Sequence, residues 1–363
     1  VESEKIDLVS VLQQIDLEKI PVFLEFKFLS PAYISPISKY LSGKNHQLTL
    51  GVDIVGNLVR TGNWYKNLDS DHEALQKIKS ANTEAATLSV DISLYENAGA
   101  TIPQQLAYAA AHAHEYLHFF KGKTGKITFK TSVGSNYFFE IAKLKALRLV
   151  YASIAGEYNT CEEIEVIAFP TKRNKSIYDY NVNMLRTTTE CMSAILGGAD
   201  WISNSPYDDI FREEDHASFG EERFGDRISR NQLLILKHES YFDKIENPAS
   251  GSFYLENLTR QFGEKALELF KDIEKGGGFL KMLKKGIIQR KIKESAAKEQ
   301  TEFDKGTRIL VGTNKYLQAE EKMKNQLERS PFLKSNVRKT LIEPILEHRL
   351  AEKTEKHRLE KEA

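Results

Sequence analysis

Three histidines lie close together in one apolar segment, and two of them have a spacing that can bind a metal ion. His112, His114 and His118 fall within residues 104–120, where apolar residues recur at three- and four-residue intervals and predict a helix. His114 and His118 would share one face of that helix, as two zinc ligands can. Because the sequence signals no further ligand, we favour solvated or hydrogen-bonded histidines over a zinc site.

The two cysteines and an acidic run are the other candidates for a nucleophile or a metal site. Cys161 is followed by two glutamates and Cys191 follows Glu190. Carboxylates beside a thiol raise its pKa, so packing is favoured over a nucleophilic role for both. Residues 208–215 hold five acidic side chains, but their spacing matches no calcium loop and favours a solvated loop.

Strands and helices alternate along most of the chain and would position any site. Six short apolar runs predict buried strands; they cover residues 22–28, 48–55, 87–92, 127–133, 165–169 and 200–203. Segments with helical spacing follow them, at residues 32–41, 72–80, 104–120, 136–155, 179–196 and 227–239. Regular alternation predicts parallel strands joined by crossover helices, either in an open doubly wound sheet or in a (β/α)8 barrel of the TIM type.

Glycine placement favours the barrel. An open sheet that binds a nucleotide would show a glycine-rich turn after an early strand, and none is present. The run Gly276-Gly277-Gly278 follows a helical stretch and is typical of a helix stop. Six strands do not close a barrel of eight, which predicts an α/β barrel over residues 1–312 that lacks its first strands. Residues 313–363 are dense in charge and predict a helical C-terminal extension that wraps a surface or a partner.

Composition excludes several classes of function. The chain of 363 residues carries 51 basic and 51 acidic side chains, so it has no basic excess for nucleic acid or an anionic membrane. We find no apolar run long enough to span a bilayer and no signal peptide at the first residues. Only two cysteines in a chain of this length favour a reducing compartment, so we expect a cytoplasmic protein.

Several short blocks, in order along the chain, are more specific than any of these clusters. They are Asn97-Ala98-Gly99-Ala100-Thr101, Glu140-Ile141-Ala142-Lys143-Leu144, Arg186-Thr187-Thr188-Thr189-Glu190, Arg227-Ile228-Ser229-Arg230-Asn231, Asn247-Pro248-Ala249-Ser250-Gly251-Ser252 and Gly312-Thr313-Asn314-Lys315-Tyr316. Together they resemble the methylmalonyl-CoA mutase family over roughly residues 17–316.

The resemblance implies a fold and a chemistry. That family uses adenosylcobalamin to rearrange the carbon skeleton of an acyl-CoA, interconverting methylmalonyl-CoA and succinyl-CoA. It has a (β/α)8 barrel for the coenzyme A ester and a separate flavodoxin-like domain for the cobalamin. In two-subunit bacterial enzymes one chain is catalytic and a related small chain is not.

The chain departs from the catalytic pattern of the family it resembles. The active-site histidine of the family falls on Leu94, and no arginine occurs between Arg60 and Arg148 to supply the expected substrate contact. The D-x-H-x-x-G signature, whose histidine is the lower cobalt ligand, is absent, as is the upstream segment with a catalytic tyrosine. On the third strand of the family barrel, Phe23, Glu25 and Lys27 would point inward and fill the lumen.

Two functions therefore remain open. One is a non-catalytic small subunit that forms a heterodimer with the catalytic large subunit, with adenosylcobalamin held by the large subunit and no cofactor, metal or catalytic residue on this chain. The other is a catalytically competent barrel whose cobalamin domain lies on another chain.

Overall fold

Six parallel strands form one sheet in the order in which they occur along the chain. The computed structural model describes residues 1–41, 44–81, 86–212, 223–333 and 338–362. The strands are β1 (Val22–Glu25), β2 (Leu48–Val52), β3 (Ala86–Asp91), β4 (Ile127–Val133), β5 (Ile164–Pro170) and β6 (Trp201–Ile202). Each pairs with the next in parallel, so the spatial order is β1-β2-β3-β4-β5-β6.

This order confirms the incomplete barrel predicted from the sequence. A doubly wound sheet reverses its strand order at a switch point and so places helices on both faces. Here every crossover advances to the next strand in one direction, and right-handed crossovers then place all connecting helices on one face. The sheet is a six-stranded half-barrel with its helices outside.

Most of the helices that connect the strands follow the predicted segments, but two short ones, at residues 54–61 and 93–97, were not predicted. Those between strands are α2 (Pro31–Leu41), α3 (Ile54–Thr61), α4 (Leu68–Ala81), α5 (Ser93–Asn97), α6 (Ile102–Phe119), α7 (Tyr137–Glu157) and α8 (Val182–Leu196). Helix α3 is a difference from the sequence prediction, which extended the second strand to residue 55. Asp53 ends β2 instead, because its side chain accepts the Gly56 N–H at 2.7 Å and caps α3.

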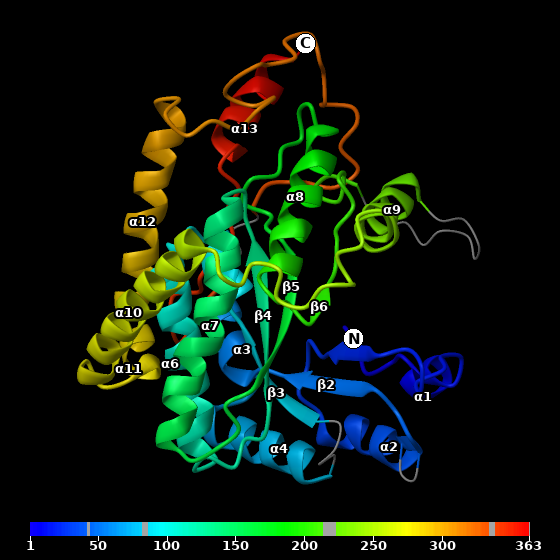
Figure 1. The fold of residues 1–363 in the computed structure, drawn as a ribbon, viewed down its shortest axis with the longest axis vertical. Helices are drawn as coiled ribbons and strands as arrows, with labels where there is room; N and C mark the ends of the chain where they lie inside the picture. The colour runs from blue at the N-terminus through cyan, green and yellow to red at the C-terminus, as the bar shows by residue number, and fades with distance from the viewer. Residues whose placement is uncertain (42–43, 82–85, 213–222, 334–337, 363) are drawn as a thin grey trace.

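The remaining helices lie outside this layer or at its ends. They are α1 (Leu8–Leu12), α9 (Phe224–His238), α10 (Phe253–Lys275), α11 (Phe279–Lys284), α12 (Ile287–Asp304) and α13 (Glu352–Lys361). Helix α10 packs on α6 and α7 and forms a second layer (Figure 1). Helix α13 lies at the end of the molecule toward which β4 and β5 run. Residues 313–333 and 338–351 are turns and extended backbone, so α13 is the helical part of the described C-terminal extension.

The two faces of the sheet differ in chemistry. Side chains alternate along a strand, and one set, including Leu50, Val90 and Phe129, is fully buried against the helices. Phe129, for example, meets Tyr151 of α7 edge-on, with the ring centroids 5.4 Å apart. The opposite set carries polar, charged and aromatic groups and forms the inner, concave face. That inner face and the carboxyl end of the strands are where a barrel enzyme would hold its substrate.

Candidate functional site at the carboxyl end of the half-barrel

Leu94 occupies the position where the resemblance places a histidine. It lies in α5, three residues after the end of β3, and only 2% of it is exposed. A leucine side chain neither donates nor accepts a hydrogen bond, so this position cannot polarise a substrate carbonyl. The neighbouring Tyr95 is also buried, and its hydroxyl lies 3.3 Å from His112 Nδ1.

Asp53 is the centre of a buried network behind that position. Its carboxylate accepts hydrogen bonds from His112 Nε2 at 2.9 Å, Tyr116 Oη at 2.7 Å and the Asp91 N–H at 2.9 Å. Burial alone would raise the pKa of Asp53, but the charge and hydrogen bond of His112 outweigh burial and hold the pKa below its usual value. Because its oxygens accept these hydrogen bonds, the Asp53 carboxylate links β2, β3 and α6 and is not placed to act as a base.

Four charged side chains form an inner-face ion cluster, made of Glu25, Arg60, Asp91 and Lys130. Lys130 Nζ lies 2.8 Å from Glu25 Oε2 and 3.3 Å from Asp91 Oδ2, and Arg60 binds the same Asp91 oxygen at 2.5 Å. Burial opposes ionisation of Asp91, yet Lys130 and Arg60 hold its pKa well below the usual range. Two acids and two bases balance, so the cluster is a closed set of ion pairs across β1, β3 and β4.

Aromatic rings cover much of the rest of the inner face. The Phe23 ring lies over Gly51, because a Cβ added to Gly51 would fall 2.3 Å from the ring. Trp201 donates its indole N–H to Glu165 at 2.8 Å, and Thr128 donates to the same carboxylate at 2.9 Å. The structure thus places Phe23 and Glu25 on one face of β1, whereas Lys27 lies two residues beyond the end of β1 and is exposed.

A C-terminal segment crosses the carboxyl end of the sheet. We call residues 338–350 the strap. The Ile342 and Ile345 N–H groups donate to the carbonyls of Gly62 and Val59, which belong to α3 and its end, after β2. The His348 N–H donates to the Asn97 carbonyl after β3, at 3.0 Å, and the Leu350 N–H donates to the Arg173 carbonyl after β5, at 2.9 Å.

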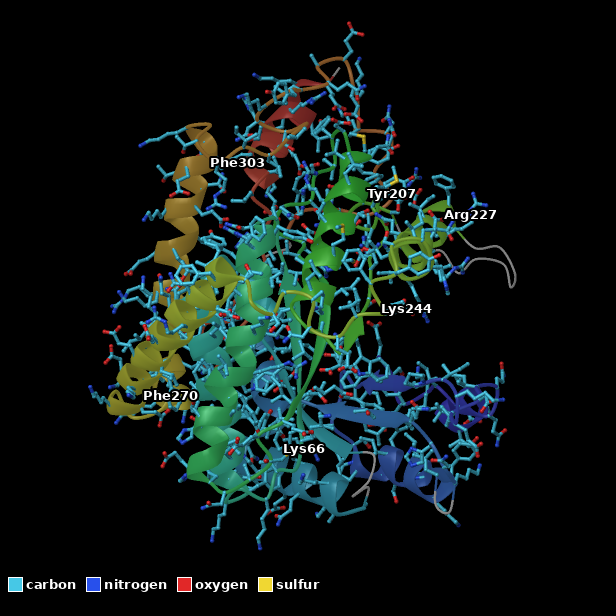
Figure 2. All side chains as sticks on the ribbon, viewed as in Figure 1. Lys66, Tyr207, Arg227, Lys244, Phe270 and Phe303 are labelled. Carbon is cyan, nitrogen blue, oxygen red and sulfur yellow. The ribbon has the colours of Figure 1, made fainter. Side chains whose placement is uncertain are left out.

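The strap is anchored at both its apolar and its charged residues. Ile342 and Ile345 are 3% and 4% exposed and belong to the main core. Arg349 pairs with Glu355 of α13 at 2.7 Å, both nearly fully buried. Leu350 packs with Phe303 at the upper end of α12 (Figure 2). The strap therefore covers the end of the half-barrel where barrel enzymes carry their active site.

His112 and His114 of α6 have partners within the fold, whereas His118 is exposed. Glu115 follows His114, so the segment reads His-Glu-x-x-His, the spacing of a zinc-protease helix. Glu115 Oε1 accepts the Leu280 N–H at 3.2 Å. His114 lies 2.8 Å from the Tyr158 hydroxyl through Nε2 and 3.3 Å from Glu274 through Nδ1. Among the described residues no group of three or more potential ligands is placed to hold a metal ion.

The remaining sequence candidates do not form a reactive site, although Asp209 lines a cavity with Asn97 and His348 at the carboxyl end. Burial and the charge of Glu190 raise the pKa of the Cys191 thiol to about 12, which keeps it unreactive. Cys161 is half-buried, at the start of the segment leading into β5. Of the acidic run, Asp208 and Asp209 are described, whereas residues 213–215 lie outside the described part of the chain.

Comparison with known proteins places the chain in a family. A family model for methylmalonyl-CoA mutase matches residues 3–361. A methylmalonyl-CoA mutase small subunit from Porphyromonas gingivalis is 37% identical over 241 residues, which is 63% of this chain and 38% of that protein. A second small subunit, from Streptomyces virginiae, is 28% identical over 74% of this chain and 44% of its own length.

Other relatives match over a similar part of the chain. A methylmalonyl-CoA mutase from Rhizobium meliloti is 34% identical over 63% of this chain and 33% of its own length. The matched region thus spans 33–44% of the length of these relatives. Within the described residues, no helix combines the length and apolar character needed to cross a membrane.

Proposed function

Because the chain belongs to the methylmalonyl-CoA mutase family, we propose that it is a non-catalytic small subunit that pairs with a catalytic large subunit. Two of the relatives are named as small subunits, which supports this choice. The observation that carries it is Leu94, buried where the family resemblance places a hydrogen-bond donor. Loss of one such donor typically raises a reaction barrier by about 2.7–4 kcal/mol.

The inner face supports the same proposal. A coenzyme A chain that ran along the barrel axis would have to displace the Phe23 ring from Gly51 and separate Lys130 from Glu25 and Asp91. Breaking a buried ion pair by removing one partner costs about 3–5 kcal/mol. We therefore assign Phe23 and Glu25 to filling the lumen, and Lys27 to its rim.

The family uses adenosylcobalamin, and we assign that cofactor to the large subunit. The D-x-H-x-x-G sequence that would supply the lower cobalt ligand is absent from this chain. In the described residues, His112 is fully buried beside Asp53, and both ring nitrogens of His114 have partners, so neither of these two offers an open ligand position. These two histidines do not fit the cofactor, and we derive no step through it.

The alternative is a catalytically competent barrel whose cobalamin domain lies on another chain. It is kept because a relative that is 34% identical is named simply as methylmalonyl-CoA mutase. On this alternative, a hydrogen-bond donor other than residue 94 would have to contact the substrate at the carboxyl end. The strap would also have to move away from Asn97 and Arg173.

Co-expression with the large subunit from the same source distinguishes the two. We expect a 1:1 complex by size-exclusion chromatography with light scattering, of obligate interface size, about 2,000 Å² or more. Methylmalonyl-CoA turnover should require the large subunit and cobalamin, and this chain alone, with cobalamin added, should give none. Two separate monomer peaks at micromolar concentration would contradict the subunit proposal. Turnover by this chain with an added cobalamin domain would establish the alternative.

A further inference from the structure

A cavity of about 460 Å³ lies between the carboxyl ends of β3, β4 and β5 and the helix α12. Its walls come from the loops that begin α6 and α7, from Arg173 and Asn174 after β5, and from Ser295 and Lys298 of α12. Neither Leu94 nor any member of the inner-face ion cluster lines it. We call it the α12 pocket, and it is separate from the position of the family's active site.

The floor of the α12 pocket holds two carboxylates and one ammonium group. Lys143 Nζ lies 2.7 Å from Glu96 Oε2 and 2.5 Å from Glu140 Oε2, and it also donates to the Ser132 carbonyl at 2.7 Å. Two N–H bonds of Lys143 are used in hydrogen bonds to Glu96 and Ser132, and its contact with Glu140 Oε2 is an ion pair. All three charged side chains are at most 9% exposed, and when both glutamates are ionised this buried cluster carries one excess negative charge. Glu299 and Glu302, also at the wall, are paired with arginines.

The second oxygen of each carboxylate faces a single point on the pocket wall. A Cβ added to Gly134, which lines the pocket, would lie 3.0 Å from Glu96 Oε1 and 3.4 Å from Glu140 Oε1. By contrast, the buried pair of Lys175 with Glu190 holds one charge of each sign.

Gln105 supplies an independent sign of a missing donor. It lines the same pocket and is 3% exposed. Its Nε2 donates to the Ala100 carbonyl at 2.9 Å, which fixes the orientation of the amide, because a carbonyl accepts only. Its Oε1 has no hydrogen-bond partner among the described residues. A buried acceptor without a donor is costly, by about 1–3 kcal/mol, and a ligand donor would remove that cost.

We propose that the α12 pocket binds a small primary amine as its ammonium ion, with the ammonium group held by Glu96, Glu140 and Gln105 Oε1. The ammonium supplies the positive charge that the floor lacks and up to three N–H donors. Lys298 at the wall would face the other end of the ligand, which suits an ω-amino acid with a terminal carboxylate. Arg308 at the same wall is already paired with Glu299 and Glu302. This inference does not depend on the proposed subunit role.

The titration of Glu140 gives the proposal a distinct readout. Burial and the charge of Glu96 raise its pKa to about 7, although Lys143 and the Gly134 N–H oppose the rise. With that pKa, the ionised fraction of Glu140 falls about tenfold between pH 8 and pH 6. A bound ammonium ion should therefore bind about tenfold more weakly at pH 6 than at pH 8.

Isothermal titration of the full chain with propylammonium, β-alanine and propionate tests the proposal. We expect 1:1 binding of propylammonium and β-alanine at pH 8, weakening about tenfold at pH 6, and no binding of propionate. Glu140→Gln should weaken propylammonium binding by at least about tenfold, the cost of one charged hydrogen bond. Gly134→Ala should block it by placing a methyl group between the two carboxylates.

Glu190→Gln is the matched control, because Glu190 is equally buried in an ion pair but does not line the pocket. It should leave propylammonium affinity unchanged, and thermal melting confirms that each variant is folded. Absence of propylammonium binding to the folded wild-type chain overturns the proposal. So does binding of propionate in its place, or an affinity that Glu140→Gln leaves unchanged.

Discussion

Asp91→Asn removes the shared anion of the inner-face ion cluster and should destabilise the half-barrel strongly. Asp91 is 6% exposed at its side chain and contacts both Lys130 and Arg60. Removing one partner of a buried pair costs about 3–5 kcal/mol. Arg60 is 36% exposed and can regain water, and Lys130 keeps Glu25, so we expect the lower end, a loss of about 3 kcal/mol in the free energy of unfolding at pH 7.

The pH dependence provides a second measure of the same cluster. The folded pKa of Asp91 is depressed below its unfolded value of 3.8. The stability from this shift is therefore fully present above about pH 4 and is lost as pH falls through the folded pKa. The difference in stability between wild type and Asp91→Asn should be constant from pH 7 to about pH 5 and should narrow below pH 4.

Urea denaturation followed by circular dichroism at pH 7, 5 and 3.5 measures both quantities. Asp16→Asn is the matched control, because Asp16 is 47% exposed and pairs with the exposed Lys19. Surface pairs contribute about 0–1 kcal/mol, so that control should change little. The reasoning would be refuted if Asp91→Asn lowered the free energy of unfolding by less than about 1 kcal/mol. It would also be refuted if the stability difference between wild type and variant did not narrow in acid, because these ion pairs would then not stabilise the inner face of the sheet.

Three further outcomes are expected. Leu94→His should not confer turnover on the isolated chain, and turnover by the variant in a coupled assay would contradict this. The substitution should lower the free energy of unfolding by about 2–5 kcal/mol, because it removes packed apolar volume and buries a polar ring. Ile345→Ala in the strap should cost about 2–5 kcal/mol and speed hydrogen exchange at the Ile345 amide, which mass spectrometry can follow; unchanged exchange would mean that the strap is not held by this side chain. Glu140 has a folded pKa raised to about 7 from 4.5, so its contribution is present below pH 4.5 and is lost as pH rises through 7; Glu140→Gln should flatten this part of the stability profile, and an unaltered profile would exclude Glu140 as the titrating group.

Local patterns in the sequence were sufficient for the barrel class but not for element ends. The predicted strand at 127–133 coincides with β4, because its apolar and β-branched residues are bounded by clear turn residues. The second strand was extended by three residues, since Ile54 and Val55 are apolar in either structure and only the Asp53 cap distinguishes them. Lys27 was placed on β1 for a similar reason, although the strand ends at Glu25.

Long-range contacts explain what the sequence could not reveal about the site. Glu25 was expected on the inner face, but its partner Lys130 lies on β4, and register between distant strands sets their contact. The strap has isolated apolar residues in a charged segment and resembles a helix by composition. Its extended course is fixed by hydrogen bonds to Gly62 and Val59, which no local pattern encodes. Gln105 and Glu140 reach one pocket from different helices, so spacing gives no signal of it.

The strap also constrains the order in which parts of the chain can fold. Its Arg338 side chain donates to the Thr61 carbonyl, a contact between residues 277 positions apart in the chain. Closing so large a loop carries a high entropic cost and must follow formation of the surfaces that reward it. During synthesis at about 5–20 residues per second, the half-barrel is made well before the strap leaves the ribosome. The carboxyl end of the sheet is thus open to chaperones, ligands or a partner chain until residues 338–350 have been made.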